Sequence, residues 1–285
     1  MLKIAIPKKG RLSNPCLEIL KKSGYEFEDS GRKLFSRIEE KNIEAVFVRT
    51  QDIPEYVQDQ VVDMGITGLD IIREREADIE IMQKMGFGKC TLTIAAPKNS
   101  SINKLDEIKN GMKIVTEFPN ITNKYFKDKG INLKVIEVSG STEIAPYLGV
   151  SDLISDIVST GTTLVMNNLK SIIPILDSEA VLIANRDSLK KKGGEIELLS
   201  SSIKSVLDAQ GKKYIMVNLP TKSLAKFEKE FHGLGGPTVM DVISKESLVA
   251  AHFVVDEKKV SETIQKLKRM GGTGILITPI ERLVN

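Results

Sequence analysis

The 285-residue sequence is poor in the residue types that build several common kinds of site. Its two cysteines, Cys16 and Cys90, form no C-x-x-C pair, which argues against a disulfide framework or a structural zinc site and fits a reducing compartment. Aromatic residues make up only 5% of the chain, so stacking platforms for nucleic-acid bases are not expected. Both histidines, His232 and His252, lie near the C-terminal end, which argues against a Ser–His or Cys–His nucleophile pair elsewhere.

The sequence also lacks an excess of one charge and long apolar runs. Lys and Arg number 41 and Asp and Glu 38, which gives a net charge of +3 and no basic tail for nucleic acid. The first residues reach a proline and a basic cluster too early for a signal peptide, and no apolar run is long enough to cross a bilayer. With 41% hydrophobic residues, the chain can build two or three domains. We expect a soluble, cytoplasmic protein without nucleic-acid or membrane partners.

Apolar strands alternate with helical segments in the first part of the chain. Residues 2–6 and 43–50 read as strands, and residues 13–24 read as a helix with Asn14 as N-cap and Pro15 in the first turn. This alternation predicts a mostly parallel sheet. Three weak internal echoes at nearly constant spacing favour two similar α/β lobes with a cleft between them, against the alternative of chance matches between short strings. The echoes pair residues 63–68 with 156–161 (D-x-x-x-T-G), 4–8 with 94–98, and 53–57 with 144–148.

The last part of the chain has an order of its own, after a helical stretch over residues 196–209 that ends at Gly211. Segments with strand and helix patterns follow one another as β-α-β-β-α-β, which is the ferredoxin-like split unit. Such a unit often binds small effectors or forms interfaces, although its fold alone does not decide between them. The predicted order is strand 214–220, helix 221–231, strands 237–244 and 248–256, helix 257–271 and strand 274–280.

A hydroxyl-rich stretch, "STGTT" at residues 159–163, follows the apolar run 152–158 and precedes a helix expected over 163–172. Gly161 permits a tight turn, and a helix N-terminus offers unpaired N–H groups to an anion. Neither a Walker lysine nor a G-x-G-x-x-G pattern is present, so the stretch is no nucleotide loop of those types. An ordinary hydroxyl-rich helix cap, worth about 1 kcal/mol, remains the alternative.

Further polar residues stand at the ends of other predicted strands. Lys9 and Arg11 in "PKKGRL" could face an anion, with Gly10 allowing close backbone approach, because ligands of open α/β sheets bind at strand ends. A solvated basic turn is the alternative for this segment. The other strand-end candidates are Arg49, Asp70 beside Thr67 and Gly68, Glu117, Thr122, and Glu143.

Together these motifs resemble the long-form ATP phosphoribosyltransferases, which catalyse the first step of histidine biosynthesis. The resemblance covers essentially the whole chain, and "DIVSTGTTL" is its most specific block. The matching blocks, in order, are "PKKGRL", "DIPEYV", "DMGITGLD", "TEFPNIT", "SGSTEIAP", "DIVSTGTTL", "VLIANR" and "GLGGPTV".

The resemblance implies a two-lobed, periplasmic-binding-protein-like α/β catalytic part and a C-terminal ferredoxin-like regulatory domain. Lobe I is expected over residues 1–90 with 185–210, lobe II over 91–184, and the regulatory domain over 211–285. The reaction implied is transfer of the phosphoribosyl group of phosphoribosyl pyrophosphate (PRPP) to N1 of ATP. Mg2+ would be held mainly by PRPP rather than by side chains, histidine would inhibit, and the chain would form dimers and hexamers.

The family's site residues carry over onto matching positions here. The catalytic candidates are Glu143, Asp156, Lys9 (with Lys8 as the alternative) and Arg11. The PRPP candidates within residues 156–164 are Asp156, Ser159, Thr160, Gly161, Thr162, Thr163 and Leu164. The ATP candidates are Gly10, Arg11, Leu12, Arg49, Asp70 and Glu117. The histidine candidates are Asn218, Leu234, Thr238 and Thr273.

Two other functions fit the same residues. A non-catalytic solute sensor would also combine two α/β lobes with an effector unit, although no DNA-binding helix pair is evident. A phosphoribosyltransferase for another base would use the same hydroxyl-rich loop. Release of pyrophosphate from ATP and PRPP would separate the expected enzyme from a sensor, and the C-terminal domain argues against another base only through the family resemblance.

Overall fold

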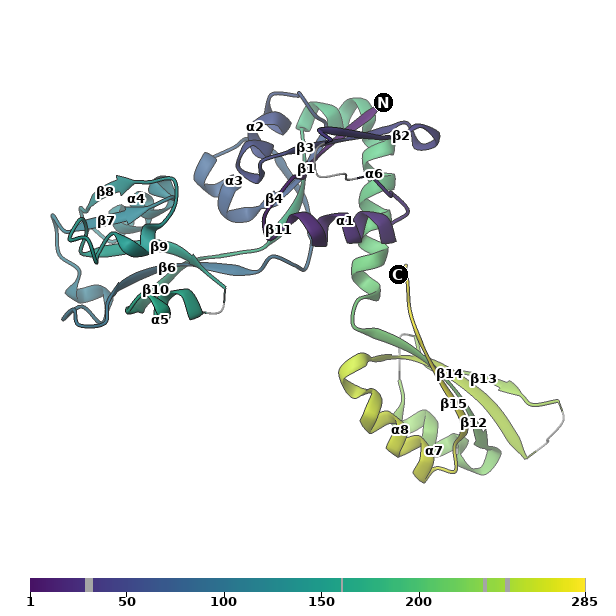
Figure 1. Ribbon diagram of the computed structural model, residues 1–285. Coiled ribbons are helices and arrows are strands. Elements are labelled where there is room, and N and C mark those ends of the chain that lie inside the picture. Colours follow the sequence, from purple (N-terminus) through teal and green to yellow (C-terminus); the bar gives the residue numbers. More distant parts are fainter. Residues whose placement is uncertain (29–32, 160, 233–234, 244–246, 285) are drawn as a thin grey trace. The chain divides into compact units, whose positions relative to one another are not determined.

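The structure is a computed structural model that describes residues 1–28, 33–159, 161–232, 235–243 and 247–284. The chain forms two compact units, Met1–Ser202 and Ile203–Asn285, and their boundary falls inside helix α6 (Arg186–Ala209) rather than after it. The first unit holds two sheets and the second unit one (Figure 1). No helix among the described residues is long and apolar enough to cross a membrane.

The first lobe is built on a six-stranded sheet of order β2-β3-β1-β4-β11-β5. Strands β1, β3 and β4 are parallel, whereas β11 runs antiparallel to both of its neighbours. Strand β11 was expected in the second lobe, but full backbone pairing with β4 places it here. The elements of this lobe are β1 (Leu2–Pro7), α1 (Ser13–Lys22), β2 (Phe35–Ile38), β3 (Ile43–Val48), α2 (Ile53–Gln58), β4 (Met64–Gly68), α3 (Leu69–Arg75), β5 (Glu80–Lys84) and β11 (Ala180–Ala184).

Helices cover this sheet because its central strands are apolar along their whole length. Ile4, Ala5 and Ile6 of β1 are fully buried, as expected for a parallel strand with both faces covered. Helix α1 begins at Ser13, with Leu12 at the N-cap position and no side-chain cap. The expectation that Asn14 caps this helix is therefore wrong, because Asn14 already lies within the first turn.

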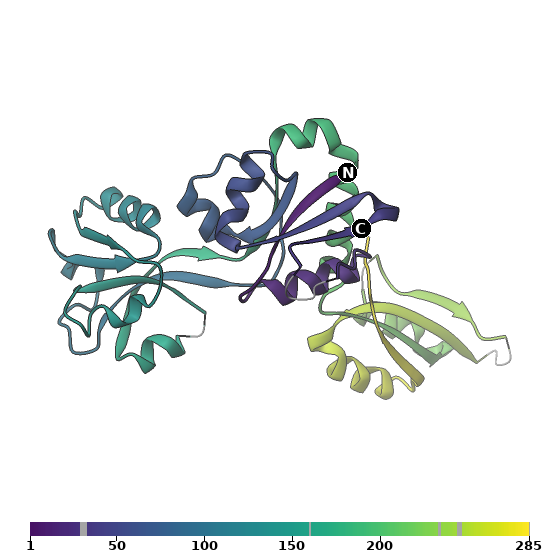
Figure 2. The same cartoon turned by 45° about the horizontal axis from the view of Figure 1, so that its top comes forward.

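The second lobe is a five-stranded sheet of order β10-β6-β9-β7-β8. Its core lies between the sheet and helix α4, where Phe126 is buried against Ile94, Ile114 and Leu153. Figure 2 shows strands β6 and β10 leading toward the first lobe, so the chain crosses twice between the two sheets. The elements are β6 (Cys90–Pro97), β7 (Lys113–Thr116), α4 (Pro119–Asp128), β8 (Lys134–Glu137), β9 (Leu153–Val158), α5 (Thr162–Met166) and β10 (Leu169–Ser178).

The two lobes share one topology. The order β3-β1-β4-β11-β5 in the first sheet corresponds to β8-β7-β9-β6-β10 in the second, with the same strand directions throughout. The expectation of two similar α/β lobes is therefore confirmed. The echo between residues 4–8 and 94–98 joins β1 to β6, which occupy different places in this topology.

The D-x-x-x-T-G echo finds the equivalent strands β4 and β9 but aligns them out of register. Asp63 Oδ2 accepts a hydrogen bond from the backbone N–H of Lys3 at 2.8 Å. Asp152 Oδ2 accepts the same bond from the N–H of Lys113, also at 2.8 Å. Asp152, rather than Asp156, is thus the counterpart of Asp63, and it closes the beginning of the sheet in the same way.

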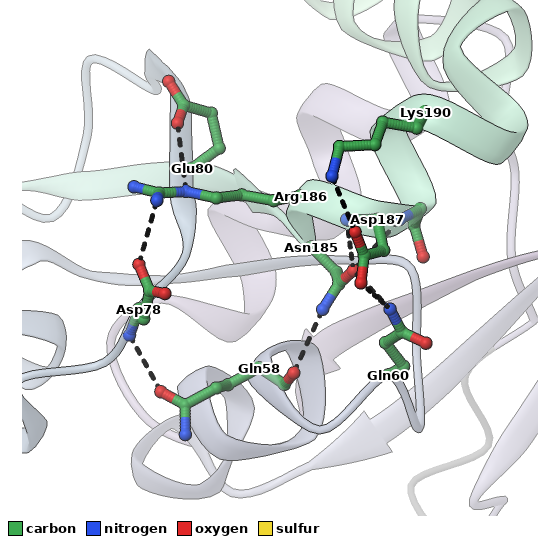
Figure 3. Close-up of polar contacts among 9 residues, drawn as sticks. Gln58, Gln60, Asp78, Glu80, Asn185, Arg186, Asp187 and Lys190 are labelled. Carbon is green, nitrogen blue, oxygen red and sulfur yellow. Dashed lines mark hydrogen bonds and ion pairs between the residues drawn. The ribbon is translucent and has the colours of Figure 1, made fainter.

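Helix α6 leaves the first lobe from a polar N-terminus (Figure 3). Asn185 Oδ1 accepts hydrogen bonds from the backbone N–H groups of Asp187 at 2.8 Å and Ser188 at 3.0 Å. Asn185 Nδ2 donates to the carbonyl oxygens of Val57 and Gln58 at 2.9 and 3.0 Å. One side chain therefore satisfies free helix donors and attaches the helix to the end of α2.

The second unit has an antiparallel sheet of order β13-β14-β12-β15, with helices α7 and α8 on one face. The chain order β-α-β-β-α-β and this strand order confirm the ferredoxin-like fold. The core consists of alternate strand residues such as Ile215 and Phe253 packed against Phe227 and Leu267 of the helices. The elements are β12 (Lys212–Pro220), α7 (Leu224–Glu230), β13 (Thr238–Asp241), β14 (Leu248–Asp256), α8 (Val260–Arg269) and β15 (Thr273–Pro279).

Candidate active site

The hydroxyl-rich stretch forms the turn between β9 and the short helix α5. Gly161 stands at the N-cap position with a φ of 77°, in the left-handed region that glycine adopts without strain. Ser159, Thr162 and Thr163 are accessible at the surface, whereas Thr160 lies outside the described residues. The strand–turn–helix order expected for an anion-binding turn is therefore present, with three of the hydroxyl side chains accessible.

The helix after this turn is shorter than expected. It was predicted over residues 163–172, but α5 ends at Met166, Asn168 takes a φ of 55°, and β10 begins at Leu169. Strand β10 pairs with β6, and a run of β-branched isoleucines favours that pairing over a helix. Leu164 is 5% exposed and packs in the core of this lobe, so its side chain anchors the turn.

Three candidate carboxylates, Glu117, Glu143 and Asp156, lie close enough to interact electrostatically, and Asp156 stands on β9, the strand that leads into the turn. Burial raises the pKa of Asp156, and the neighbouring charge of Glu143 raises it further. A hydrogen bond from Thr142 Oγ1 to Asp156 Oδ2, 2.5 Å long, acts in the opposite direction. Burial also raises the pKa of Glu117, as do the charges of Asp156 and Glu143. These side chains form an acidic cluster whose members repel one another and favour a cationic partner.

The basic loop of the first lobe holds one arginine in a defined environment. Arg11 Nη2 donates to Cys90 Sγ at 3.0 Å and lies 3.6 Å from Asp70 Oδ2. Leu12 is buried, whereas Gly10 has a φ of 89°, and a Cβ added there would meet no atom within 4 Å. Arg11 and Asp70, both predicted as ATP contacts, are thus brought together, and Arg11 stays 39% exposed.

The other two cationic residues predicted for the site, Lys9 and Arg49, are both accessible at the surface. Each follows a strand that ends at the same edge of the parallel sheet, Lys9 after β1 and Arg49 after β3. Both side chains are therefore available to an anionic ligand at that edge.

Candidate site residues line parts of two cavities. The first, of about 390 Å³, is lined from both lobes: Gln51, Ile71, Glu74 and Arg75 from one, and Glu117–Asn120 with Glu137–Ser139 from the other. The second, of about 290 Å³, is lined by Ser159 together with Lys84, Lys89, Cys90, Ser178 and neighbouring residues. Of the predicted site residues, Glu117 lines the first cavity and Ser159 the second.

Comparison with known proteins places the chain in a family. The "ATP phosphoribosyltransferase" family model matches residues 49–205, and the "HisG, C-terminal domain" model matches residues 209–282. The ATP phosphoribosyltransferase of Methanococcus maripaludis strain C6 is 46% identical over 100% of both chains. That of Methanothermobacter thermautotrophicus is 46% identical over 99% of both chains.

The chain belongs to the ATP phosphoribosyltransferase family. It is an enzyme of the long form, because the C-terminal domain is present. Among solved structures, the ATP phosphoribosyl transferase (HisG:HisZ) complex from Thermotoga maritima matches with a TM-score of 0.64 and 33% identity. The match covers 72% of this chain and 96% of that chain.

The ATP phosphoribosyltransferase fold here contains two polar residues that the sequence did not single out. Glu74 of α3 accepts hydrogen bonds from the backbone N–H groups of Asn120 at 2.8 Å and Ile121 at 3.0 Å, at the N-terminus of α4. Ser178, the last residue of β10, exchanges two hydrogen bonds with Asp70. Neither stands in a motif, since each finds its partner far away along the chain.

The histidine candidates fall on the sheet of the C-terminal domain. Asn218 and Thr273 are register partners on β12 and β15. Thr238 lies on β13 opposite His252 of β14, which places it two strands, or roughly 10 Å, from β12. Leu234 lies outside the described residues. The structure thus brings two of the four candidates together and sets a third at a distance on the same sheet.

No group of three or more His, Cys, Asp or Glu side chains suited to a metal ion occurs within the part of the chain that the structure describes. The acidic cluster nevertheless offers oxygen atoms of the kind that Mg2+ prefers. Such a site fits a cation that brings most of its own ligands, as an ion bound to a diphosphate does.

Proposed function

We propose that this ATP phosphoribosyltransferase joins C1 of the PRPP ribose to N1 of ATP and releases pyrophosphate, the first step of histidine biosynthesis. In this reaction the C1–N1 bond forms while the C1–O bond to pyrophosphate breaks, and the bonding electrons leave with the pyrophosphate. The observation that carries the proposal is the acidic cluster of Glu117, Glu143 and Asp156, with Asp156 on the strand that leads into the glycine turn. Its charge suits the positive ribose that develops as pyrophosphate departs.

The turn at residues 159–163 is the proposed cradle for the 5-phosphate of PRPP. Accessible hydroxyls of Ser159, Thr162 and Thr163 can donate to phosphate oxygens, and Gly161 allows the chain to bend around them. Asp156 and Glu143 would hold the ribose hydroxyls and favour positive charge on the ring. No covalent intermediate is needed, so the residues act by positioning and by charge.

Cations of the first lobe complete the proposed site. Arg11 offers a planar group for bidentate contact with phosphate oxygens, and Lys9 and Arg49 are accessible at neighbouring strand ends. With these contacts in one lobe and the phosphate cradle in the other, ATP and PRPP would meet between the lobes. Exclusion of water there would limit hydrolysis of PRPP.

Magnesium is part of this proposal. Mg2+ usually keeps several waters and is bound through one or two carboxylates and substrate phosphates, a requirement that the acidic cluster can meet. Bound with pyrophosphate, the ion would neutralise charge on the leaving group. The ion would be held mainly by PRPP rather than by side chains.

Regulation and assembly follow the same family reasoning. We assign histidine inhibition to the C-terminal sheet around Asn218, Thr238 and Thr273, with the two lobes of the first unit carrying catalysis. We further propose a cytoplasmic enzyme that assembles as dimers and hexamers. The full-length match to long-form relatives supports each of these assignments.

The proposal is tested by incubating the protein with ATP, PRPP and Mg2+ and measuring pyrophosphate and a ribosylated ATP product. Both should appear in equal amounts, and omission of any one component should abolish them. Pyrophosphate released equally well without ATP would indicate hydrolysis and refute the transfer. Repeating the assay with histidine tests inhibition in the same experiment, and another base in place of ATP tests base specificity.

A further inference from the structure

The two connections between the lobes meet at one pair of residues. Strand β6 begins at Cys90 as the chain enters the second lobe, and strand β10 ends at Ser178 as the chain returns. Cys90 and Ser178 are register partners in the antiparallel pairing of these strands. The two crossings between the lobes therefore run side by side at this pair.

Ser178 makes two hydrogen bonds with Asp70, one to its carboxylate and one from its backbone N–H. Its hydroxyl donates to Asp70 Oδ1 at 2.8 Å and accepts the backbone N–H of Asp70 at 2.9 Å. The Asp70 side chain is 3% exposed, so water cannot substitute fully for this contact. With Oδ1 fixed in this way, Oδ2 faces Arg11.

Arg11 is held by the same pair of crossing residues. Its Nη2 atom lies 3.6 Å from Asp70 Oδ2 and donates to Cys90 Sγ at 3.0 Å. The guanidinium therefore rests on Cys90 directly and on Ser178 through Asp70. A guanidinium carries five N–H donors, so others remain for a ligand. The adjoining cavity is lined by Cys90, Ser178 and Ser159.

Gly68 gives independent support for a fixed Asp70 carboxylate. A Cβ at this position would lie 2.0 Å from Asp70 Oδ1, whereas the backbone of Gly68, with φ of −83° and ψ of 142°, suits any residue. A Cβ here would displace the Asp70 carboxylate from its observed position, whereas the chain conformation itself admits other residues. The missing side chain of Gly68 thus leaves space for the Asp70 carboxylate in the position where Ser178 binds it.

We propose that Ser178 is a positioning residue that sets the orientation of Arg11 through Asp70, so that the cationic contact for a phosphate-bearing substrate is assembled on the crossing strands. The inference rests on the proposed role of Arg11 as a substrate contact. Ser178 would then affect substrate affinity in addition to its place where the chain connects the two lobes. Bending at the crossing would then move the arginine together with the lobes.

The test is a double-mutant cycle in the full-length protein with Arg11→Ala and Ser178→Ala. We expect Arg11→Ala to weaken the binding of ATP or of PRPP, titrated separately by calorimetry, by about tenfold or more, since it removes a charge-assisted contact. Ser178→Ala should weaken the same ligand by about three- to tenfold, and it should change nothing further when Arg11 is already alanine.

Matched variants separate positioning from damage to the fold. Ser178→Thr keeps the hydroxyl and should restore affinity, while Gly68→Ala should reproduce Ser178→Ala by displacing the carboxylate. Ser171→Ala makes the same substitution at an exposed position of the same strand and should leave affinity unchanged. Thermal unfolding of each variant shows whether a loss of affinity follows a loss of folded protein.

Each outcome decides the inference. An equal loss from Ser178→Ala with and without Arg11 would show a structural role only and overturn it, as would Ser178→Ala with unchanged affinity. Unchanged binding of both ligands in Arg11→Ala would overturn it as well. The cycle measures binding without turnover. A protein that binds ATP and PRPP but releases no pyrophosphate would therefore refute the proposed function, while the affinities of the variants could still be compared.

Discussion

At the scale of single residues, the site depends on carboxylates whose ionisation is opposed by burial. Asp156 has a raised pKa for this reason, and the hydrogen bond from Thr142 partly offsets the effect. Thr142 is 1% exposed, so its hydroxyl can be removed without opening the surface. Burial and the charge of Glu143 oppose ionisation of Asp156, whereas Thr142 Oγ1 and the backbone N–H of Ile157, 2.7 Å from Asp156 Oδ1, favour it.

We expect Thr142→Val to move the acid limb of kcat/KM to higher pH. Loss of the donor removes the effect that lowers the pKa of Asp156, so the carboxylate needs a higher pH to ionise. Activity should fall most at low pH and be retained at high pH, where Asp156 is ionised in both proteins. A full pH profile measures this, and a uniform loss at every pH would contradict it.

Gly161 gives a prediction about the proposed phosphate cradle. Gly161→Ala adds a Cβ that meets nothing within 4 Å, so the cost comes from a φ of 77° alone, about 1 kcal/mol. The turn should relax away from this conformation and the KM for PRPP should rise about fivefold or more, with less change for ATP. Gly149→Ala is the control, because Gly149 has a φ of 69° and equally open surroundings. Equal effects of the two substitutions on PRPP would contradict the assignment.

At the scale of elements, Glu74 joins the lobes by capping one helix from another. Its carboxylate on α3 is 8% exposed and accepts two N–H groups at the N-terminus of α4, and Asn120 Nδ2 returns a bond to the Glu74 carbonyl at 2.9 Å. A negative group at this helix end is favourable. Burial nevertheless raises the pKa of Glu74, because its carboxylate loses part of its hydration in this contact.

Glu74→Ala should lower the free energy of unfolding by about 1–2 kcal/mol, because it leaves two donors of α4 without their acceptor. Denaturant unfolding measures the change. Glu55→Ala is the matched control, since it removes an equal charge from a half-exposed ion pair with Arg75 at 3.3 Å. That exposed pair should contribute about 0.5 kcal/mol or less. Similar losses in both variants would argue against the cap.

At the scale of the whole molecule, two units of different kind share one helix. The boundary at Ser202 and Ile203 falls within α6, a helix that departs from helical backbone angles at Lys192, where φ is −130° and ψ is 28°. We propose a regulatory role for the second unit.

Histidine inhibition supplies the prediction at this scale. Thr273→Ala should raise the histidine concentration that gives half-inhibition about tenfold, because the loss of one hydrogen bond to the inhibitor weakens binding by about that factor. The kcat measured without histidine should not change. Thr278→Ala makes the same change at another exposed position of β15 and should leave inhibition unaffected. Inhibition curves on the three proteins decide between a local site at Thr273 and a general effect on the sheet.

Much of the architecture could be predicted because local patterns and packing agree. Apolar runs such as β1 specify buried strands, and the β-α-β-β-α-β order specifies the second unit. The helix expected over 163–172 was wrong because strand pairing of β10 overrides local preference. The assignment of β11 to the second lobe was wrong for a similar reason, since its partners β4 and β5 are distant in sequence.

The sequence by itself determined which residues could serve as cations, carboxylates and turn glycines, because side-chain chemistry and the freedom of glycine are local properties. Only the tertiary structure decided that Ser178 faces Asp70, that Glu74 caps α4, and that Asp152 matches Asp63. Each of these contacts joins residues brought together by sheet pairing or by the packing of helices. A hydrogen bond depends on distance in space, which the chain fixes only once it has folded.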